Sequence, residues 1–202
     1  MFHLMEIPVL LVYSYIHFVW DGRVAILALT ALFLILLEVE YVRLEVRPKL
    51  PAIMSLFRPR ERNNVTGTVF FIAATIIVFS AFDYSIAMLA LLLTVFGDLA
   101  SALVGIKYGK HKLFNKKTWE GFLAGFAMNL LVGFLFLPQF PLVFIPMAIV
   151  AAVVELITNK LDDNLTVPLF SGFTGQMIVY LFVLNLPPFP GPLAWIFQLF
   201  PL

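Results

Sequence analysis

The stretch IAMLALLLTVFGDLASALVGI, residues 86–106, decides the fold. It is a continuous apolar run, and a helix needs roughly 20 such residues to cross a bilayer. The run holds a single ionisable residue, Asp98. A charged side chain at the bilayer centre costs at least about 2.5–3.5 kcal/mol, so such a residue usually faces a cavity or a polar partner. The stretch therefore predicts a membrane-spanning helix that carries a functional carboxylate.

The composition of the whole chain also indicates a membrane protein. The 202 residues are 62% hydrophobic and 12% charged, and this charge content is half of the about 25% found in soluble domains. The chain has no cysteine, which excludes a disulfide framework and a cysteine-ligated metal site. Continuous apolar runs rather than alternating ones disfavour a β-barrel. We expect an all-α, polytopic membrane helical bundle that forms one domain over residues 1–202.

About seven transmembrane helices are expected in all. They are predicted at residues 5–20, 24–42, 66–82, 86–106, 120–137, 141–157 and 165–184, of which the first and the sixth are short. The segment 185–202 is broken by prolines and is expected to lie along the membrane interface.

Lysine and arginine predict the orientation of these helices. Twelve of the 13 basic residues fall in loops of one side, and Arg23 falls in a loop of the other. Cytoplasmic loops carry an excess of Lys and Arg. The N-terminus and the basic loops are therefore expected in the cytosol, in the cell membrane of a prokaryote or the endoplasmic reticulum of a eukaryote.

Most of the acidic residues fall at one depth, on the basic side. Asp98 lies eight residues before the inner end of its helix, roughly 12 Å deep at about 1.5 Å per residue. Glu120 opens the next helix, Glu155 closes the sixth, and Asp162 and Asp163 follow in the next inner loop. Mg²⁺ is usually held by one or two carboxylates together with substrate phosphates. Asp98, Asp162 and Asp163 therefore predict a metal site that binds a phosphate-bearing substrate at the membrane surface.

The loop GIKYGKHKLFNKKTWEG, residues 105–121, contains five lysines between glycines. Backbone amides at Gly105 and Gly109 can approach phosphate oxygens, and Lys112 and its neighbours can neutralise them. A P-loop is excluded, because the glycine spacing is one residue short and His111 stands where Ser or Thr is required. The lysines equally fit anchoring to anionic lipid headgroups.

Simpler structural roles remain open for several of these polar residues. Thr118 can cap a helix whose first turn contains Glu120, and Asn164 can cap the seventh helix. The small residues near Asp98 can form a packing seam between helices, with the aspartate as a buried hydrogen-bonded group.

Three segments together carry a resemblance to a known family. FGDLASALVGIKYGK (96–110), KKTWEG (116–121) and VELITNKLDDNLTVPLFSG (154–172) resemble the CTP-dependent lipid kinases, which include dolichol kinase, phytol kinase and yeast-type diacylglycerol kinase. That family is distantly similar to phosphatidate cytidylyltransferase. The resemblance implies CTP as phosphate donor, a divalent cation such as Mg²⁺ and a lipid alcohol as acceptor. The family's motif residues correspond here to Gly97, Asp98, Lys116, Lys117, Thr118, Glu120, Gly121, Glu155, Asp162, Asp163, Asn164 and Pro168. Among them, the nucleotide and its phosphates are expected to contact Lys116, Lys117, Thr118, Glu120, Gly121 and Asn164.

These observations predict a kinase that phosphorylates a dolichol-like, phytol-like or diacylglycerol acceptor at the cytosolic face. Asp98, Asp162 and Asp163 would hold the metal, Lys116 and Lys117 would neutralise the phosphates, and Asp163 or Glu155 would act as the base. No nucleic-acid partner is expected.

Three alternatives are kept beside the kinase. The first is a phosphatidate cytidylyltransferase-like enzyme that makes a CDP-lipid, although its arginine-aspartate signature is not visible. The second is a small transporter whose acids relay ions. The third is a non-catalytic subunit, which would follow if the chain lacks the arginine-lysine pair that relatives carry before a histidine, here His3.

Overall fold

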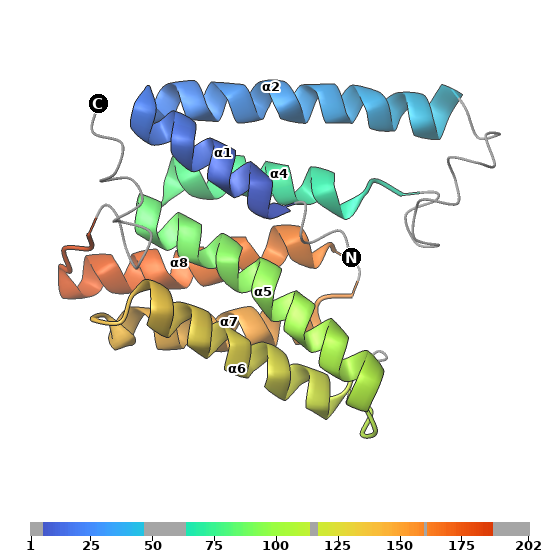
Figure 1. The fold of residues 1–202 in the computed structure, drawn as a ribbon, viewed down its shortest axis with the longest axis vertical. Coiled ribbons are helices and arrows are strands. Elements are labelled where there is room, and N and C mark those ends of the chain that lie inside the picture. Colours follow the sequence, from blue (N-terminus) through green and yellow to red (C-terminus); the bar gives the residue numbers. More distant parts are fainter. Residues whose placement is uncertain (1–5, 47–63, 114–116, 160, 188–202) are drawn as a thin grey trace.

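The computed structural model describes residues 6–46, 64–113, 117–159 and 161–187, which fold into a bundle of helices with alternating direction (Figure 1). The elements are α1 (Glu6–Val19), α2 (Gly22–Tyr41), the π-helical turn η2 (Val42–Val46), α4 (Gly67–Ala81), α5 (Tyr84–Tyr108), α6 (Trp119–Phe136), α7 (Pro141–Ile157) and α8 (Asp163–Phe182). No strand occurs in these ranges apart from an isolated bridge between Lys112 and Thr118. The predicted all-α fold and each of its seven helices are confirmed. The predicted interfacial tail lies largely outside the described residues.

Helix α5 lies at the centre of the bundle. Its N-terminal half is buried on every side, with Ile86, Leu89 and Leu91 fully inaccessible, as expected for a helix that is apolar all round. It packs against α6, α7, α8 and α4. Helix α2 is the opposite case, because it contacts mainly α1 and α4 and buries only Ala25, Leu29 and Glu40. Asp98 thus lies on the helix at the centre of the bundle, which packs against α4, α6, α7 and α8.

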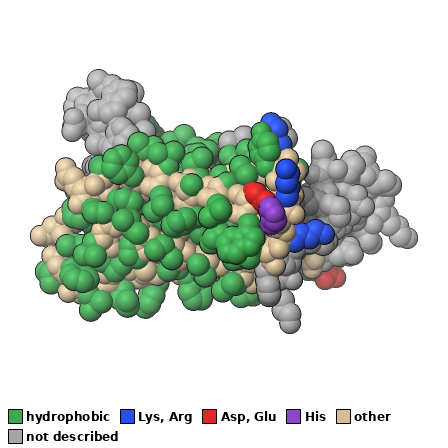
Figure 2. All heavy atoms as spheres, turned by 90° about the horizontal axis from the view of Figure 1, so that it is seen from below, with side chains coloured by type: hydrophobic (Ala, Val, Ile, Leu, Met, Phe, Trp, Pro, Cys, Tyr) green, Lys and Arg blue, Asp and Glu red, His purple; other side chains and the backbone are tan. Residues whose placement is uncertain are grey.

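Four helices are long and apolar enough to cross a bilayer: α2 with its π-helical extension, α5, α6 and α8. Helices α1, α4 and α7 are apolar but shorter. Large hydrophobic side chains such as Leu131, Phe134 and Phe173 point outward from the bundle, and each is at least half exposed. Figure 2 shows hydrophobic side chains over most of one face, with the charged ones gathered at one end. These features are typical of a protein whose helices are surrounded by lipid.

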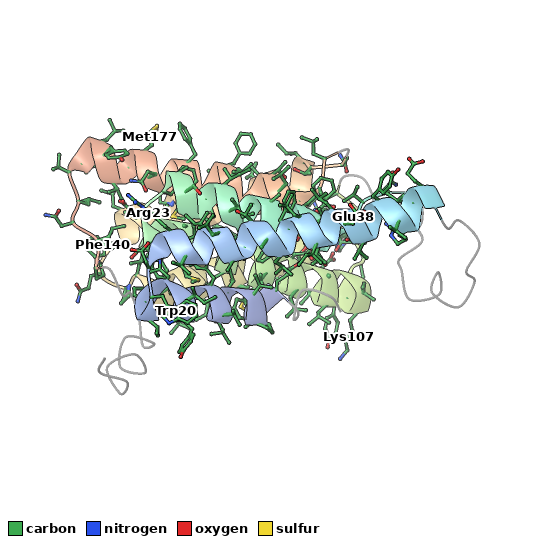
Figure 3. The ribbon with its side chains drawn as sticks, turned by 90° about the horizontal axis from the view of Figure 1, so that it is seen from above. Trp20, Arg23, Glu38, Lys107, Phe140 and Met177 are labelled. Carbon is green, nitrogen blue, oxygen red and sulfur yellow. The ribbon has the colours of Figure 1, made fainter. Side chains whose placement is uncertain are left out.

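The two ends of the bundle differ in charge. Lys107 and Glu38 lie at one end, whereas Trp20, Arg23 and Phe140 lie at the other (Figure 3). We call the first the basic end; it holds the C-termini of α2, α5 and α7 and the N-termini of α4, α6 and α8.

Hydrogen bonds between distant segments close the end opposite the basic end. The side chain of Gln176 on α8 donates to Asp83, 3.0 Å away, and accepts from the Asp83 backbone N–H at 2.8 Å. The hydroxyl of Tyr84 on α5 donates to Ser14 on α1 at 2.8 Å. These contacts connect α8 to the α4–α5 turn and α1 to α5.

Candidate functional site

The candidate site is built from helix ends that meet at the basic end. Glu155 comes from the last turn of α7, Lys117 from the segment just before α6, and Asp163 from the first turn of α8. Asp98 comes from α5, ten residues before that helix ends. Residues far apart in the sequence are brought together because successive helices run in opposite directions.

Glu155 and Lys117 form the best-defined contact of the cluster. The Lys117 Nζ lies 3.6 Å from the Glu155 carboxylate and also donates a hydrogen bond to the Glu155 backbone carbonyl. Ser101 on α5 lies near this carboxylate, and both face Gly125 of α6. Because the Glu155 side chain is only 9% exposed, Lys117 supplies the partner that a buried carboxylate requires.

Asp98 and Asp163 lie close enough to Glu155 to interact with it electrostatically. Asp163 in turn interacts with Asp98, with Asp162 and with Lys117. Asp98, Asp162 and Asp163 are each half-buried. The structure therefore brings the acids of α5, α7 and the start of α8 near one another, and their joint role in a metal site stays a prediction.

Asp162 also has a structural role at the start of α8. Its carboxylate accepts a hydrogen bond from the Asn164 backbone N–H at 3.1 Å and so forms the N-cap of α8. The alternative in which Asn164 caps this helix is therefore wrong. Asn164 lies inside the helix, is buried, and packs its amide where a side chain at Gly67 of α4 would otherwise stand.

The lysines of the loop differ in whether they reach the charged cluster. The backbone pairs Leu113 N–H with the Lys117 carbonyl at 2.8 Å and Trp119 N–H with the His111 carbonyl at 2.9 Å. This pairing directs Lys117 toward Glu155, while Lys112 stays exposed. Lys116 lies outside the described residues.

The predicted phosphate-binding residues Gly105, Gly121 and Thr118 meet at the contact between α5 and α6. A side-chain carbon at Gly121 would lie 3.2 Å from the Gly105 Cα and 2.9 Å from the Ser101 carbonyl. Thr118 caps α6 by accepting from the Gly121 N–H at 3.2 Å, which confirms the predicted cap. These glycines thus let α5 and α6 approach closely, and phosphate binding by them stays a prediction.

Gly109 and Glu120 also have local partners. A side chain at Gly109 would collide with Thr118. The Glu120 carboxylate lies 2.7 Å from the His111 Nδ1 and accepts, at 3.3 Å, from the His111 backbone N–H. Glu120 therefore holds the exposed loop in shape, and its proposed contact with the nucleotide stays a prediction.

The donor set suits a divalent cation that arrives with phosphate. Within the described ranges, no three His, Asp or Glu side chains are arranged to enclose a metal ion by themselves. Mg²⁺ does not require such a cage, because it usually keeps several waters and binds one or two carboxylates plus phosphate oxygens. Asp98 and Asp163 repel each other, and a cation between them would relieve that repulsion. These two residues, with Asp162 beside them, would hold the metal.

Two residues near the cluster were not assigned a role from the sequence. Ser101 is one of the small residues near Asp98, and it lies near the Glu155 carboxylate. Asn129 on α6 is 1% exposed and packs against Gly97, next to Asp98. A polar amide in the apolar run of a membrane helix is the signal that could have singled out Asn129.

The fold and the site define a helical membrane protein with acidic and basic side chains clustered at one end. The chain belongs to the cytidylyltransferase family, whose model matches residues 2–163. That range includes Asp98, the lysine loop and Glu155, and it ends at Asp163. No curated protein and no solved structure gives a significant match. Family membership indicates an enzyme that uses CTP, and it supports the distant relationship to phosphatidate cytidylyltransferase rather than the kinase branch in particular.

Proposed function

We propose that this protein is a CTP-dependent kinase that transfers the γ-phosphoryl group of CTP to the hydroxyl of a membrane lipid. The observation that carries the proposal is the cluster of Asp98, Lys117, Glu155 and Asp163 at one end of a lipid-facing bundle. Membership of a CTP-using family supports the nucleotide. The outward-facing hydrophobic side chains support an acceptor that stays in the bilayer.

The reaction needs positioning and charge neutralisation more than covalent chemistry by the protein. The lipid hydroxyl oxygen attacks the γ-phosphorus, the bond from that phosphorus to the β–γ bridging oxygen breaks, and CDP leaves. Lys117 places a positive charge beside the phosphates. A divalent cation, when bound, would neutralise the phosphate oxygens, and Asp98 and Asp163 are the residues that would hold it.

We assign the general base to Glu155. Asp163 interacts with both Asp98 and Asp162, an arrangement suited to a cation, whereas Glu155 forms the direct ion pair with Lys117. When CTP phosphates attract Lys117, the Glu155 carboxylate is freed to accept the proton of the lipid hydroxyl. Binding of the nucleotide would thereby prepare the base.

A second candidate is favoured by the family match, whose description is cytidylyl transfer. In that reaction a lipid phosphate oxygen attacks the α-phosphorus of CTP, pyrophosphate leaves, and a CDP-lipid forms. The same lysine and metal-binding carboxylates would serve both reactions, since each breaks a phosphoanhydride bond of CTP.

Two labelled forms of CTP separate these candidates. Purified protein is incubated with Mg²⁺ and γ-labelled or α-labelled CTP, together with polyprenol, phytol, diacylglycerol or phosphatidate. The kinase predicts a lipid monophosphate labelled only from γ-labelled CTP, with CDP as the second product. A lipid labelled only from α-labelled CTP, with pyrophosphate released, would instead establish the cytidylyltransferase.

The basic end is proposed to face the cytosol, where CTP is available. The described Arg43, Lys107, Lys110, Lys112 and Lys117 all belong to this end, and Arg23 lies at the opposite one. The excess of Lys and Arg in cytoplasmic loops supports this orientation. The membrane would be the cell membrane of a prokaryote or the endoplasmic reticulum of a eukaryote.

A further inference from the structure

Asn129 is a buried polar residue that the proposed reaction has not used. It lies in the middle of α6, is 1% exposed, and its Oδ1 has no hydrogen-bond partner among the described residues. A buried amide oxygen without a donor destabilises a protein, and the hydrocarbon region of a bilayer offers no water to replace it. An unpaired group of this kind calls for a partner.

The position of Asn129 connects it to the charged cluster. Its amide fills the space beside Gly97, where any side chain would overlap the Asn129 oxygen. Four residues earlier on the same face of α6 is Gly125, at which a side-chain carbon would lie 3.7 Å from the Glu155 carboxylate. Residues four apart are stacked on one helix face. Asn129 therefore lies beside the residue that precedes Asp98, one helical turn further from the basic end than the position that faces the Glu155 carboxylate.

The chemistry of the unpaired atom limits the kind of partner. An amide oxygen accepts a hydrogen bond, so the missing group must be a donor. Carboxylates and ionised phosphates offer only acceptors, whereas a lipid hydroxyl offers an O–H. Asn129 follows Glu120 by nine residues, which is about 13 Å along the helix, and a lipid headgroup that enters from the bilayer can reach this depth.

We propose that Asn129 binds the substrate alcohol by accepting a hydrogen bond from its hydroxyl, an inference that rests on the proposed function. This hydrogen bond would hold the alcohol before reaction, and its single hydroxyl proton would pass from the Asn129 oxygen to the Glu155 carboxylate as the alcohol oxygen attacks the γ-phosphorus. Because Gly97 has no side chain, a small separation of α5 and α6 at this point would expose the Asn129 amide to the substrate. No side chain of Gly97 would have to move. The site selects lipids that carry a hydroxyl donor over lipids that lack one.

Replacement of Asn129 by alanine tests this role through kinetics. With saturating CTP, Asn129→Ala should raise the KM for the lipid alcohol or lower turnover at least tenfold, while the KM for CTP and the melting temperature stay close to those of wild type. Thr94→Val is the matched control, because Thr94 is also buried on the neighbouring helix but donates to its own helix at the Ala90 carbonyl, 2.9 Å away. This control should keep full activity.

A binding measurement adds a readout that a packing role would not change. Wild-type protein should be stabilised against heat more by a long-chain alcohol than by its O-methyl ether, and Asn129→Ala should lose this discrimination. If Asn129→Ala does not accumulate as folded protein, Asn129→Leu provides the same comparison.

Two other results would reject the proposal in different ways. A variant that keeps wild-type kinetics and still discriminates alcohol from ether would reject the role of Asn129 alone. Wild-type protein that forms no phosphorylated lipid and does not discriminate would reject the proposed function, and this role with it.

Discussion

At the scale of single residues, the site places one lysine, Lys117, among several carboxylates. Glu155 is paired with Lys117 at 3.6 Å, while Asp98 and Asp163 lie beside it with like charge. Breaking a buried pair by removing one partner is costly because the other charge is left uncompensated. Removal of Lys117 should therefore lower the stability of the fold as well as weaken nucleotide binding, whereas neutralising Asp163, which has like-charged neighbours, leaves no buried charge without its partner.

Asp163→Asn should lower turnover at least tenfold and leave the amount of folded protein unchanged. The substitution keeps the shape of the side chain but removes the negative charge that would hold a divalent cation. Product formation from labelled CTP measures the effect, with Glu38→Gln as the control, because Glu38 is an exposed acid at the same end of the bundle. Wild-type turnover of Asp163→Asn would remove this residue from the metal site.

Lys117→Met should raise the KM for CTP at least tenfold, because the charge that faces the phosphates is lost. Lys107→Met is the matched control, since Lys107 is exposed at the same end. Equal KM values for the two variants would show that Lys117 serves the fold rather than the nucleotide.

At the scale of elements, hydrophobicity and length were enough to predict every helix, because continuous apolar runs leave few alternatives in a membrane. Contacts between helices were harder to predict. The small residues Gly97, Ser101 and Gly105 allow close approach by either a ligand or another helix, and the structure shows them packed against Gly121, Gly125 and Asn129. Sequence spacing alone does not reveal which partner helix a small residue approaches.

The site was predictable to the extent that its residues are unusual in an apolar chain. Asp98, Glu155 and Asp163 stand out for that reason. Asp162 was harder to interpret, because a carboxylate at a helix start serves equally as a cap or as a ligand, and its hydrogen bond to the Asn164 N–H assigns the cap. The pairing of Glu120 with His111 depends on the path of the loop, which no periodicity describes.

Gly125→Leu should destabilise the contact between α5 and α6. Even a first side-chain carbon at this position would lie 3.1 Å from both the Gly97 carbonyl and the Ser101 Cβ, and overpacking of this kind typically costs about 1–3 kcal/mol. Thermal unfolding in detergent should show a lower midpoint than wild type. Leu123→Ile, on the exposed face of the same helix, should leave the midpoint unchanged, and a wild-type midpoint for Gly125→Leu would contradict the packing role.

At the scale of the whole molecule, the two ends of the bundle should be accessible from opposite sides of the membrane. The chain has no cysteine, so single cysteines can be introduced without background. Lys110→Cys at the basic end should react with an impermeant maleimide only from the cytosolic side, and Gln139→Cys in the α6–α7 turn only from the other. Both positions are exposed. The reverse pattern would invert the proposed orientation.

The hydrogen bonds that join Asp83 to Gln176 and Tyr84 to Ser14 lie far from the charged cluster. Because these bonds hold the helices together at that end, we expect any separation of helices that admits lipid and nucleotide to occur at the basic end. Lipid and nucleotide could then be exchanged there without opening a continuous path for ions across the membrane. An enzyme built in this way can work on both a water-soluble and a lipid-soluble reactant and still preserve the permeability barrier.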